Sequence, residues 1–282
     1  MGLRKMPFLV TPAEQGQDLI AFLAARLSLS RRRAKDLLDR RTVFVNDRRV
    51  WMARHALKAR DTVTVFMETQ TPDSPSTPPA PPRILYEDGR FLVADKPPGL
   101  VSNGPDSVES RLRELTGKPG LRAVHRLDRD TSGCLLFAFD DALFDRMVAL
   151  FRAEKIGKLY HALTMGRIAA DTAIEKPLDG QKAVTRIHVL DANKLASHVQ
   201  ARIETGRTHQ IRKHLAMIRH PVLGDREYGN AAPLDEVYQS IPRQMLHAFR
   251  LEYPDPETNA PVRVESPLPW DFRAAMKRLG LT

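Results

Sequence analysis

A proline-rich segment divides this chain and limits how it can fold. Residues 69–82 contain six prolines and few apolar side chains. A segment of this kind cannot form a core and is typical of an extended, semi-rigid tether. We therefore expect a small domain over residues 12–67, a Pro-rich linker over 68–83 and a large domain over 84–282, an organisation that suits a chain of 282 residues.

The positive charge is concentrated ahead of this linker. The formal net charge is +10, and residues 1–67 supply most of it, with 14 Lys or Arg against 6 Asp or Glu. Such an uneven distribution indicates a polyanionic partner. Nucleic acid is favoured over a membrane surface, because the basic segment lacks a continuous amphipathic helix with bulky aromatic residues.

The composition also argues against several classes of protein. A single cysteine, Cys134, excludes an intramolecular disulfide and a Cys-based zinc finger, and its apolar surroundings predict a buried thiol. His125, His209 and His214 have no carboxylate or thiolate partner at a familiar spacing, so we expect no metal site. Because no apolar stretch could span a bilayer and the chain start lacks a signal peptide's apolar core, we expect a cytoplasmic protein without a membrane partner.

The small domain shows the pattern of two helices feeding a small sheet. Apolar residues recur at helical spacing over residues 19–27, a second helix is predicted over 31–41, and strands over 42–50 and 61–66. This pattern resembles the S4 RNA-binding domain. The resemblance implies RNA contacts for the basic residues of the second helix, namely Arg31, Arg32, Arg33, Lys35, Arg40 and Arg41. The alternative is a solvated basic face without a partner.

The stretch His125-Arg126-Leu127-Asp128-Arg129-Asp130-Thr131-Ser132-Gly133 is the strongest candidate for a chemical site. It predicts a tight turn carrying Asp128, and the apolar run over residues 134–139 predicts a buried strand directly after it. A carboxylate at the edge of the core, kept ionised by Arg126 or Arg129, suits a nucleophile or a base. The alternative is an Asp that only caps its own turn.

The rest of the large domain predicts more strands than helices. Strands are expected over residues 84–96 (as a pair), 135–139, 159–165, 183–190, 198–204 and 246–253. Helices are expected over 106–116, 141–152 and 208–218. Their irregular alternation indicates an α+β fold with a mixed or antiparallel sheet.

The stretch from His125 to Gly133 closely resembles the signature of the RluA family of pseudouridine synthases. Further segments match the family in its order along the chain: Lys158-Leu159-Tyr160-His161-Ala162, Thr205-Gly206-Arg207-Thr208-His209-Gln210-Ile211-Arg212, His220-Pro221-Val222-Leu223-Gly224-Asp225 and Leu246-His247-Ala248. The resemblance covers roughly residues 84–282. It implies the family's catalytic domain, and an enzyme that isomerises uridine to pseudouridine in RNA without cofactor or metal.

Three catalytic residues follow from the resemblance. Asp128 would carry out the isomerisation, either as a nucleophile or by removing a ribose proton. Arg212 would pair with Asp128 and favour its charged form, although a helix-surface Arg in contact with phosphate or solvent is the alternative. Tyr160 would stack on the target base and could carry a proton, although a Tyr on an alternating strand is otherwise half-buried packing.

The pocket and the substrate are also implied. Leu246 and Ile211 would form its apolar wall, although Leu246 is a core residue by default. Arg126 and Arg207 would contact phosphates or insert into the RNA loop. The target uridine must leave its stack, so we expect structured RNA, ribosomal RNA before transfer RNA, and a monomeric enzyme. The alternatives are a non-catalytic RNA-binding or ribosome-assembly factor, and a nucleosidase with a second acid or a metal.

Overall fold

A computed structural model describes residues 3–27, 29–39, 42–50, 52, 55–68, 82–229 and 236–282. The chain forms two compact units, residues 1–77 and 78–282, and each unit has a sheet of its own. Residues 69–81, most of the predicted linker, lie outside the described residues.

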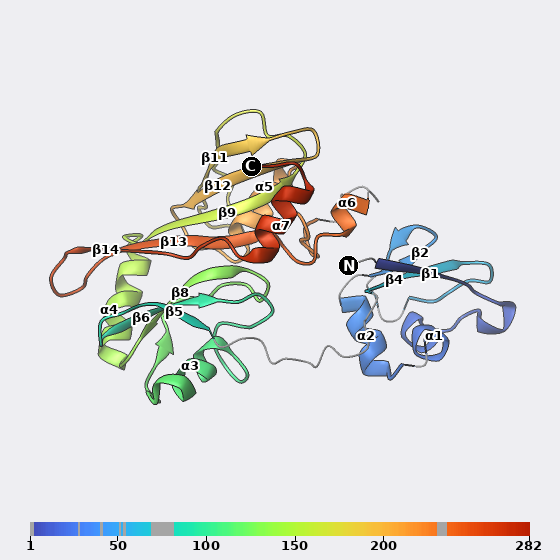
Figure 1. Cartoon of the computed structure of the whole chain (residues 1–282), viewed down its shortest axis with the longest axis horizontal. Helices are drawn as coiled ribbons and strands as arrows, with labels where there is room; N and C mark the ends of the chain where they lie inside the picture. The colour runs from blue at the N-terminus through green and yellow to red at the C-terminus, as the bar shows by residue number, and fades with distance from the viewer. Residues whose placement is uncertain are drawn as a thin grey trace. The chain divides into compact units, whose positions relative to one another are not determined.

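The small unit packs two helices against a four-stranded sheet (Figure 1). Its elements are β1 (Leu3–Leu9), the 3-10 helix η1 (Pro12–Glu14), α1 (Leu19–Arg26), α2 (Arg31–Asp39), β2 (Val43–Val45), β3 (Arg48–Arg49) and β4 (Thr62–Glu68), with strand order β1-β4-β2-β3. Asp18 caps α1 by accepting a hydrogen bond from the Ala21 N–H at 2.6 Å. The strand β1 was not predicted, and it lies ahead of the predicted range 12–67.

The basic helix α2 buries one side only. Ala34 and Leu38 are in the core of the small unit, whereas Arg31, Arg33 and Lys35 are exposed. The side chain of Arg32 and the whole of Arg40 and Arg41 fall outside the described parts of the chain. The assignment of this unit as an S4 domain stays a prediction.

The large unit is built on a ten-stranded sheet. Eight strands follow the order β10-β11-β12-β9-β13-β8-β6-β5, and the other two are β14, beside β13, and β7, beside β8. Its strands are β5 (Arg83–Glu87), β6 (Phe91–Lys96), β7 (Arg122–Ala123), β8 (Ser132–Ala138), β9 (Gly157–Met165), β10 (Thr172–Ile174), β11 (Thr185–Ala192), β12 (Ala196–Ile203), β13 (Leu246–Pro254) and β14 (Pro261–Glu265). Its helices are α3 (Val108–Thr116), α4 (Asp141–Arg152), α5 (Gln210–Met217), α6 (Glu236–Gln239) and α7 (Trp270–Arg278).

The two halves of this sheet meet where β8 and β13 run parallel, between the β5–β6 side and the β9–β12 side (Figure 1). The other described strand pairs of the unit are antiparallel, so the sheet is mixed and the predicted α+β class is confirmed. Gly133 is required at this junction. Its φ is +111°, and a Cβ on it would collide with the backbone of Ala248 on β13.

Helices cover both faces of the sheet. Because strand side chains alternate between faces, Leu135 and Phe137 of β8 share a core with α3 and α5, whereas Cys134 and Leu136 share one with α4. The helix α7 packs on Leu163 of β9, opposite to the face that carries Tyr160. In the described parts of the chain, no helix combines the length and the apolar character that crossing a membrane requires.

Candidate active site

The turn that carries Asp128 is fixed by hydrogen bonds with five residues outside it. Ser102 bonds both the N–H and the carbonyl of Leu127, at 2.9 and 3.1 Å. The Arg129 carbonyl accepts from Lys96 Nζ at 2.8 Å, and the Asp130 carbonyl accepts from Arg243 at 3.0 Å. Further contacts come from Gln244 to the Thr131 hydroxyl and from Arg129 back to the Gly99 carbonyl. The turn precedes β8, whose seven residues are all buried, so Asp128 lies at the edge of the core as predicted.

Arg212 is the ionic partner of Asp128. Its Nη1 lies 2.9 Å from Asp128 Oδ2, while its Nε and Nη2 hold the two oxygens of Asp225 at 2.6 and 2.9 Å. The expectation that Arg126 or Arg129 would keep Asp128 ionised is therefore wrong in detail. The guanidinium comes from α5, 84 residues along the chain, and Arg129 instead donates to a backbone carbonyl.

Arg212 and Asp225 form a buried pair that stays charged. Burial works against both charges, but the hydrogen bonds and the mutual attraction outweigh it. They raise the pKa of Arg212 and hold the pKa of Asp225 below its usual value. Backbone N–H groups of Glu227 and Tyr228 also bind Asp225, at 2.9 and 3.0 Å. Asp225 therefore holds in place the guanidinium that contacts Asp128.

His209 is a second contact of Asp128, and its part in the site was not predicted. Its Nε2 lies 3.6 Å from Asp128 Oδ1, and its Nδ1 lies 3.1 Å from the Tyr228 hydroxyl and 3.3 Å from Glu227 Oε2. The residue precedes α5 in a left-handed conformation, with φ 55° and ψ 28°. Non-glycine residues seldom adopt this conformation, and they do so mainly where the surrounding contacts require it.

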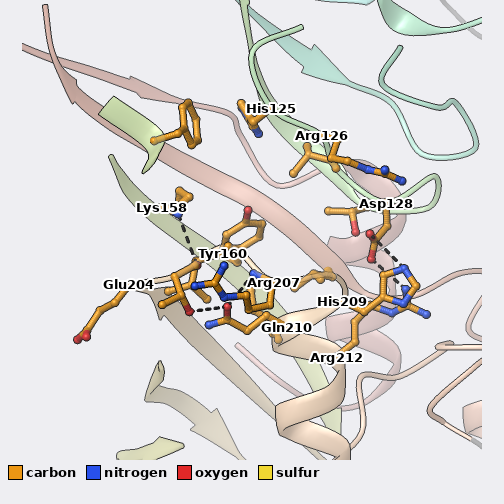
Figure 2. A pocket seen from close by; sticks show the side chains of 18 of the residues that line it. His125, Arg126, Asp128, Lys158, Tyr160, Glu204, Arg207, His209, Gln210 and Arg212 are labelled. Carbon is orange, nitrogen blue, oxygen red and sulfur yellow. Dashed lines mark hydrogen bonds and ion pairs between the residues drawn. The ribbon is translucent and has the colours of Figure 1, made fainter. Parts of the chain in front are cut away.

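A cavity of about 470 Å³ opens beside Asp128. Tyr160 on β9, Ile211 on α5 and Leu246 on β13 contribute to its walls, and each of them is buried. Figure 2 shows Tyr160 between Lys158 and Asp128. Burial raises the pKa of the Tyr160 hydroxyl, which keeps the phenol neutral. A flat ring, two apolar side chains and one anchored carboxylate make an enclosure for a planar, partly polar group.

Three basic side chains, Arg126, Arg207 and Lys158, also line the cavity, with Arg126 on the Asp128 side and Lys158 on the other side of Tyr160 (Figure 2). Arg207 donates to the Lys182 carbonyl at 3.1 Å. His125 adds no charge, because burial lowers the pKa of its imidazole to about 3 and its Nε2 accepts the Leu136 N–H. Sequence reasoning had not assigned Lys158 a role.

The structure brings together the predicted site residues of the large unit around one cavity: Asp128, Tyr160, Arg212, Ile211, Leu246, Arg126 and Arg207. The predicted RNA-binding residues of α2 belong to the small unit and are described apart from it. Cys134 is a buried free thiol, as expected, and burial raises its pKa to about 12. Among the described residues, no cluster of three or more His, Cys, Asp or Glu side chains could hold a metal ion.

The segments that form this cavity match a known protein family. The family model described as RNA pseudouridylate synthase matches residues 90–217, which include the Asp128 turn, β9 and α5. The ribosomal large subunit pseudouridine synthase D of Xanthomonas campestris is 32% identical over 259 residues, covering 80% of this chain and 78% of that protein. An uncharacterised RNA pseudouridine synthase of Bacillus subtilis is 34% identical over 250 residues, covering 79% and 86%.

The fold is shared as well. A solved structure of human RNA pseudouridylate synthase domain containing 4 superposes with a TM-score of 0.61 at 26% identity, and the match covers 71% of this chain and 94% of that one. Sequence, fold and the order of the cavity segments agree, and the chain therefore belongs to the RluA family of RNA pseudouridylate synthases.

Proposed function

We propose that this protein converts specific uridines of large-subunit ribosomal RNA to pseudouridine, with Asp128 as its catalytic residue. The observation that carries the proposal is the position of Asp128 in the lining of this cavity, where it is held by Arg212, which is itself anchored on Asp225. The choice of RNA rests on relatives that are named as ribosomal large subunit enzymes in Xanthomonas campestris and Haemophilus influenzae.

Pseudouridine formation depends on a site that holds the sugar and the base rigidly, more than on strongly acidic groups. The bond from the ribose to N1 of uracil breaks, the base turns within the cavity, and a new bond forms to C5. One proton leaves C5 and one is gained at N1, so the conversion is an isomerisation. Asp128 starts it, either by attack or by taking a ribose proton, and Arg212 stabilises the carboxylate as an anion.

Access to the cavity requires that the uridine leaves its stack. Unstacking costs a few kcal/mol and least in loops, and the Tyr160 ring offers the extruded base a new stacking surface. Leu246 and Ile211 supply an apolar wall against which the extruded base can pack. This supports loops of structured RNA as the substrate.

The test is tritium release from an in vitro transcript of large-subunit RNA that carries [5-³H]uridine, since only C5–H cleavage frees the label. We expect release by the wild-type protein and none by Asp128→Asn, which keeps the shape of the side chain. Release by both proteins would refute the role of Asp128. Release from transfer RNA but not from the large-subunit transcript would refute the assigned substrate.

A further inference from the structure

Two buried lysines of the large unit differ in how their ammonium groups are satisfied. Lys96 is fully buried and donates to two carbonyls, those of Pro97 at 3.0 Å and Arg129 at 2.8 Å. Lys158 is only 8% exposed, yet among the described residues its one hydrogen-bond acceptor is the Thr205 carbonyl, at 3.5 Å. An ammonium has three N–H donors, so Lys158 retains donors for a ligand in the cavity that it lines.

The surroundings of Lys158 favour an anion. No carboxylate in the described parts of the chain lies within 4.0 Å of its Nζ, since none of the ion pairs involves Lys158. Burial lowers the pKa of Lys158, as does the nearby charge of Arg207, while Glu154 opposes the shift. A buried cation without a close counter-ion is costly, and an incoming anion would remove that cost.

The position of Lys158 relates this cation to the stacking surface. Lys158 and Tyr160 lie two residues apart on β9, so their side chains share one face, roughly 7 Å apart along the strand. Asp128 lies on the far side of Tyr160 from Lys158 (Figure 2). The Asp128 end also holds cations, Arg126 and Arg212, but Arg212 is already paired with Asp128 and Asp225. A nucleotide that stacks its base on Tyr160 and extends its sugar-phosphate backbone toward Lys158 would bring a phosphate to a buried ammonium that has no close carboxylate among the residues that the structure describes.

We propose that Lys158, together with Arg207, binds a phosphodiester of the RNA backbone adjacent to the target uridine. This inference rests on the proposed function and adds an anion subsite to the same cavity. Lys158 is then a binding residue that contributes to substrate affinity. It takes no part in breaking the glycosidic bond.

The test compares Lys158→Met and Lys158→Arg in the full-length protein by tritium release from the [5-³H]uridine transcript. For Lys158→Met we expect KM to rise about 10- to 100-fold, the usual value of a charge-assisted hydrogen bond, with kcat within about twofold of wild type. The slope of log(kcat/KM) against log salt should become shallower by about 0.7–0.9, as for one lost phosphate contact. Lys158→Arg should keep the wild-type slope.

Two controls make the result specific. Lys176→Met removes an exposed lysine that does not line the cavity, so its KM should stay near wild type. Thermal unfolding of both Lys158 variants separates lost affinity from lost structure, and the Arg variant tests the charge even if the Met variant unfolds.

Three outcomes would overturn the inference. An unchanged KM in Lys158→Met would mean that no ligand binds there. A raised KM with an unchanged salt slope would mean that Lys158 contacts a neutral group of the base. A reduced kcat with unchanged KM would assign it to chemistry. If wild-type protein released no tritium, the proposed function would fail, and the salt slopes of RNA binding by wild type and Lys158→Met would still decide the subsite.

Discussion

Arg212 is the side chain on which the geometry of the site depends most. One guanidinium contacts Asp128, Asp225 and Glu227 and lies 5.0 Å from the centre of the Tyr228 ring. Because its planar fork holds Asp225 through two donors, the third donor is left facing Asp128 in a fixed direction. A lysine could supply the charge at this position but not the planar two-donor contact with Asp225.

Replacing Arg212 should affect stability and turnover separately. Arg212→Met leaves Asp225 buried without its partner, which should cost about 3–5 kcal/mol of unfolding free energy. Turnover should fall by at least about 100-fold, while RNA affinity changes little. In Arg212→Met/Asp225→Asn the uncompensated charge is removed, so stability should recover but turnover should not. These quantities follow from urea unfolding and tritium release, and recovery of turnover in the double variant would show that Arg212 acts only on the fold.

Two substitutions of His209 can separate the effect of its strained backbone from the effect of its side-chain contact with Asp128. Its left-handed backbone costs an alanine about 1–2 kcal/mol but costs a glycine nothing. We expect His209→Gly to unfold at a temperature near that of wild type and to lose roughly 10- to 100-fold in turnover, because Asp128 Oδ1 loses a contact that orients it. His209→Ala should lose both stability and turnover. Full turnover in a folded His209→Gly protein would contradict a role for the imidazole.

The sequence predicted which residues gather at the cavity but not how they are held. Matches to a known family identified Asp128, Tyr160 and Arg212, and the local pattern around Asp128 correctly placed it before a buried strand. Local reasoning chose the wrong arginine, because the real partner is 84 residues away. The second contact from His209 depends on a backbone conformation that only the packed fold enforces, so no spacing in the sequence indicates it.

The junction of β8 and β13 is the element on which the site is built. The turn with Asp128 leads into β8, Leu246 begins β13, and Tyr160 lies on β9 along the other edge of β13, opposite Ala248. The strands β8 and β9 are consecutive in the chain, whereas β13 comes from a distant part of it. The parallel pairing covers His247 with Ser132 and Ala248 with Gly133. Any displacement of this pairing moves the Asp128 carboxylate relative to the cavity wall.

Gly133→Ala tests the junction directly. The added Cβ would collide with the Ala248 backbone, and alanine is strained at a φ of +111°. We therefore expect the free energy of unfolding to fall by about 3 kcal/mol and turnover to be lost. Gly180→Ala is the matched control, since Gly180 has a φ of +74° but nothing within 4 Å of its Cβ position, and it should cost only about 1 kcal/mol. Denaturant unfolding measures the stability of both variants. Equal losses of unfolding free energy would mean that the close approach of β13 adds no cost beyond backbone strain.

Helices and buried strands were predictable because their patterns are local. The predicted helix over 141–152 matches α4, and the predicted strands over 159–165 and 246–253 fall within β9 and β13. The parallel pairing of β8 with β13 joins residues more than 100 positions apart, and no local pattern encodes it. The strand β1 was not predicted, since it contains Pro7, which removes a backbone donor, and the basic pair Arg4-Lys5. Pro7 is tolerated because β1 forms the edge of its sheet.

The molecule divides into two units with separate cores and different charge. The small unit has its own apolar cluster from Val10 to Val65, and the clusters of the large unit begin beyond it. Most of the excess positive charge lies in residues 1–67. This division supports an arrangement in which one unit contributes nonspecific RNA affinity and the other performs the chemistry.

Deleting residues 1–67 should weaken RNA binding by about 10-fold or more and reduce its salt slope, because several phosphate contacts are lost. The large unit should keep its cooperative unfolding transition, since its cores are its own. A second variant keeps the small unit and its core and replaces only the exposed Arg31, Arg33 and Lys35 by Gln. Filter binding over a range of salt concentrations measures the RNA affinity of both variants. An unchanged salt slope in the deletion variant would refute the claim that the small unit contributes RNA affinity.

The most direct test of the central claim is pseudouridine mapping of total RNA from cells that lack this gene, complemented with wild type or with Asp128→Asn. We expect at least one site in large-subunit ribosomal RNA to disappear on deletion, to return with the wild-type protein, and to stay absent with the variant. If no site in that RNA changes, or if Asp128→Asn restores it, the proposed substrate or the proposed catalytic residue is wrong.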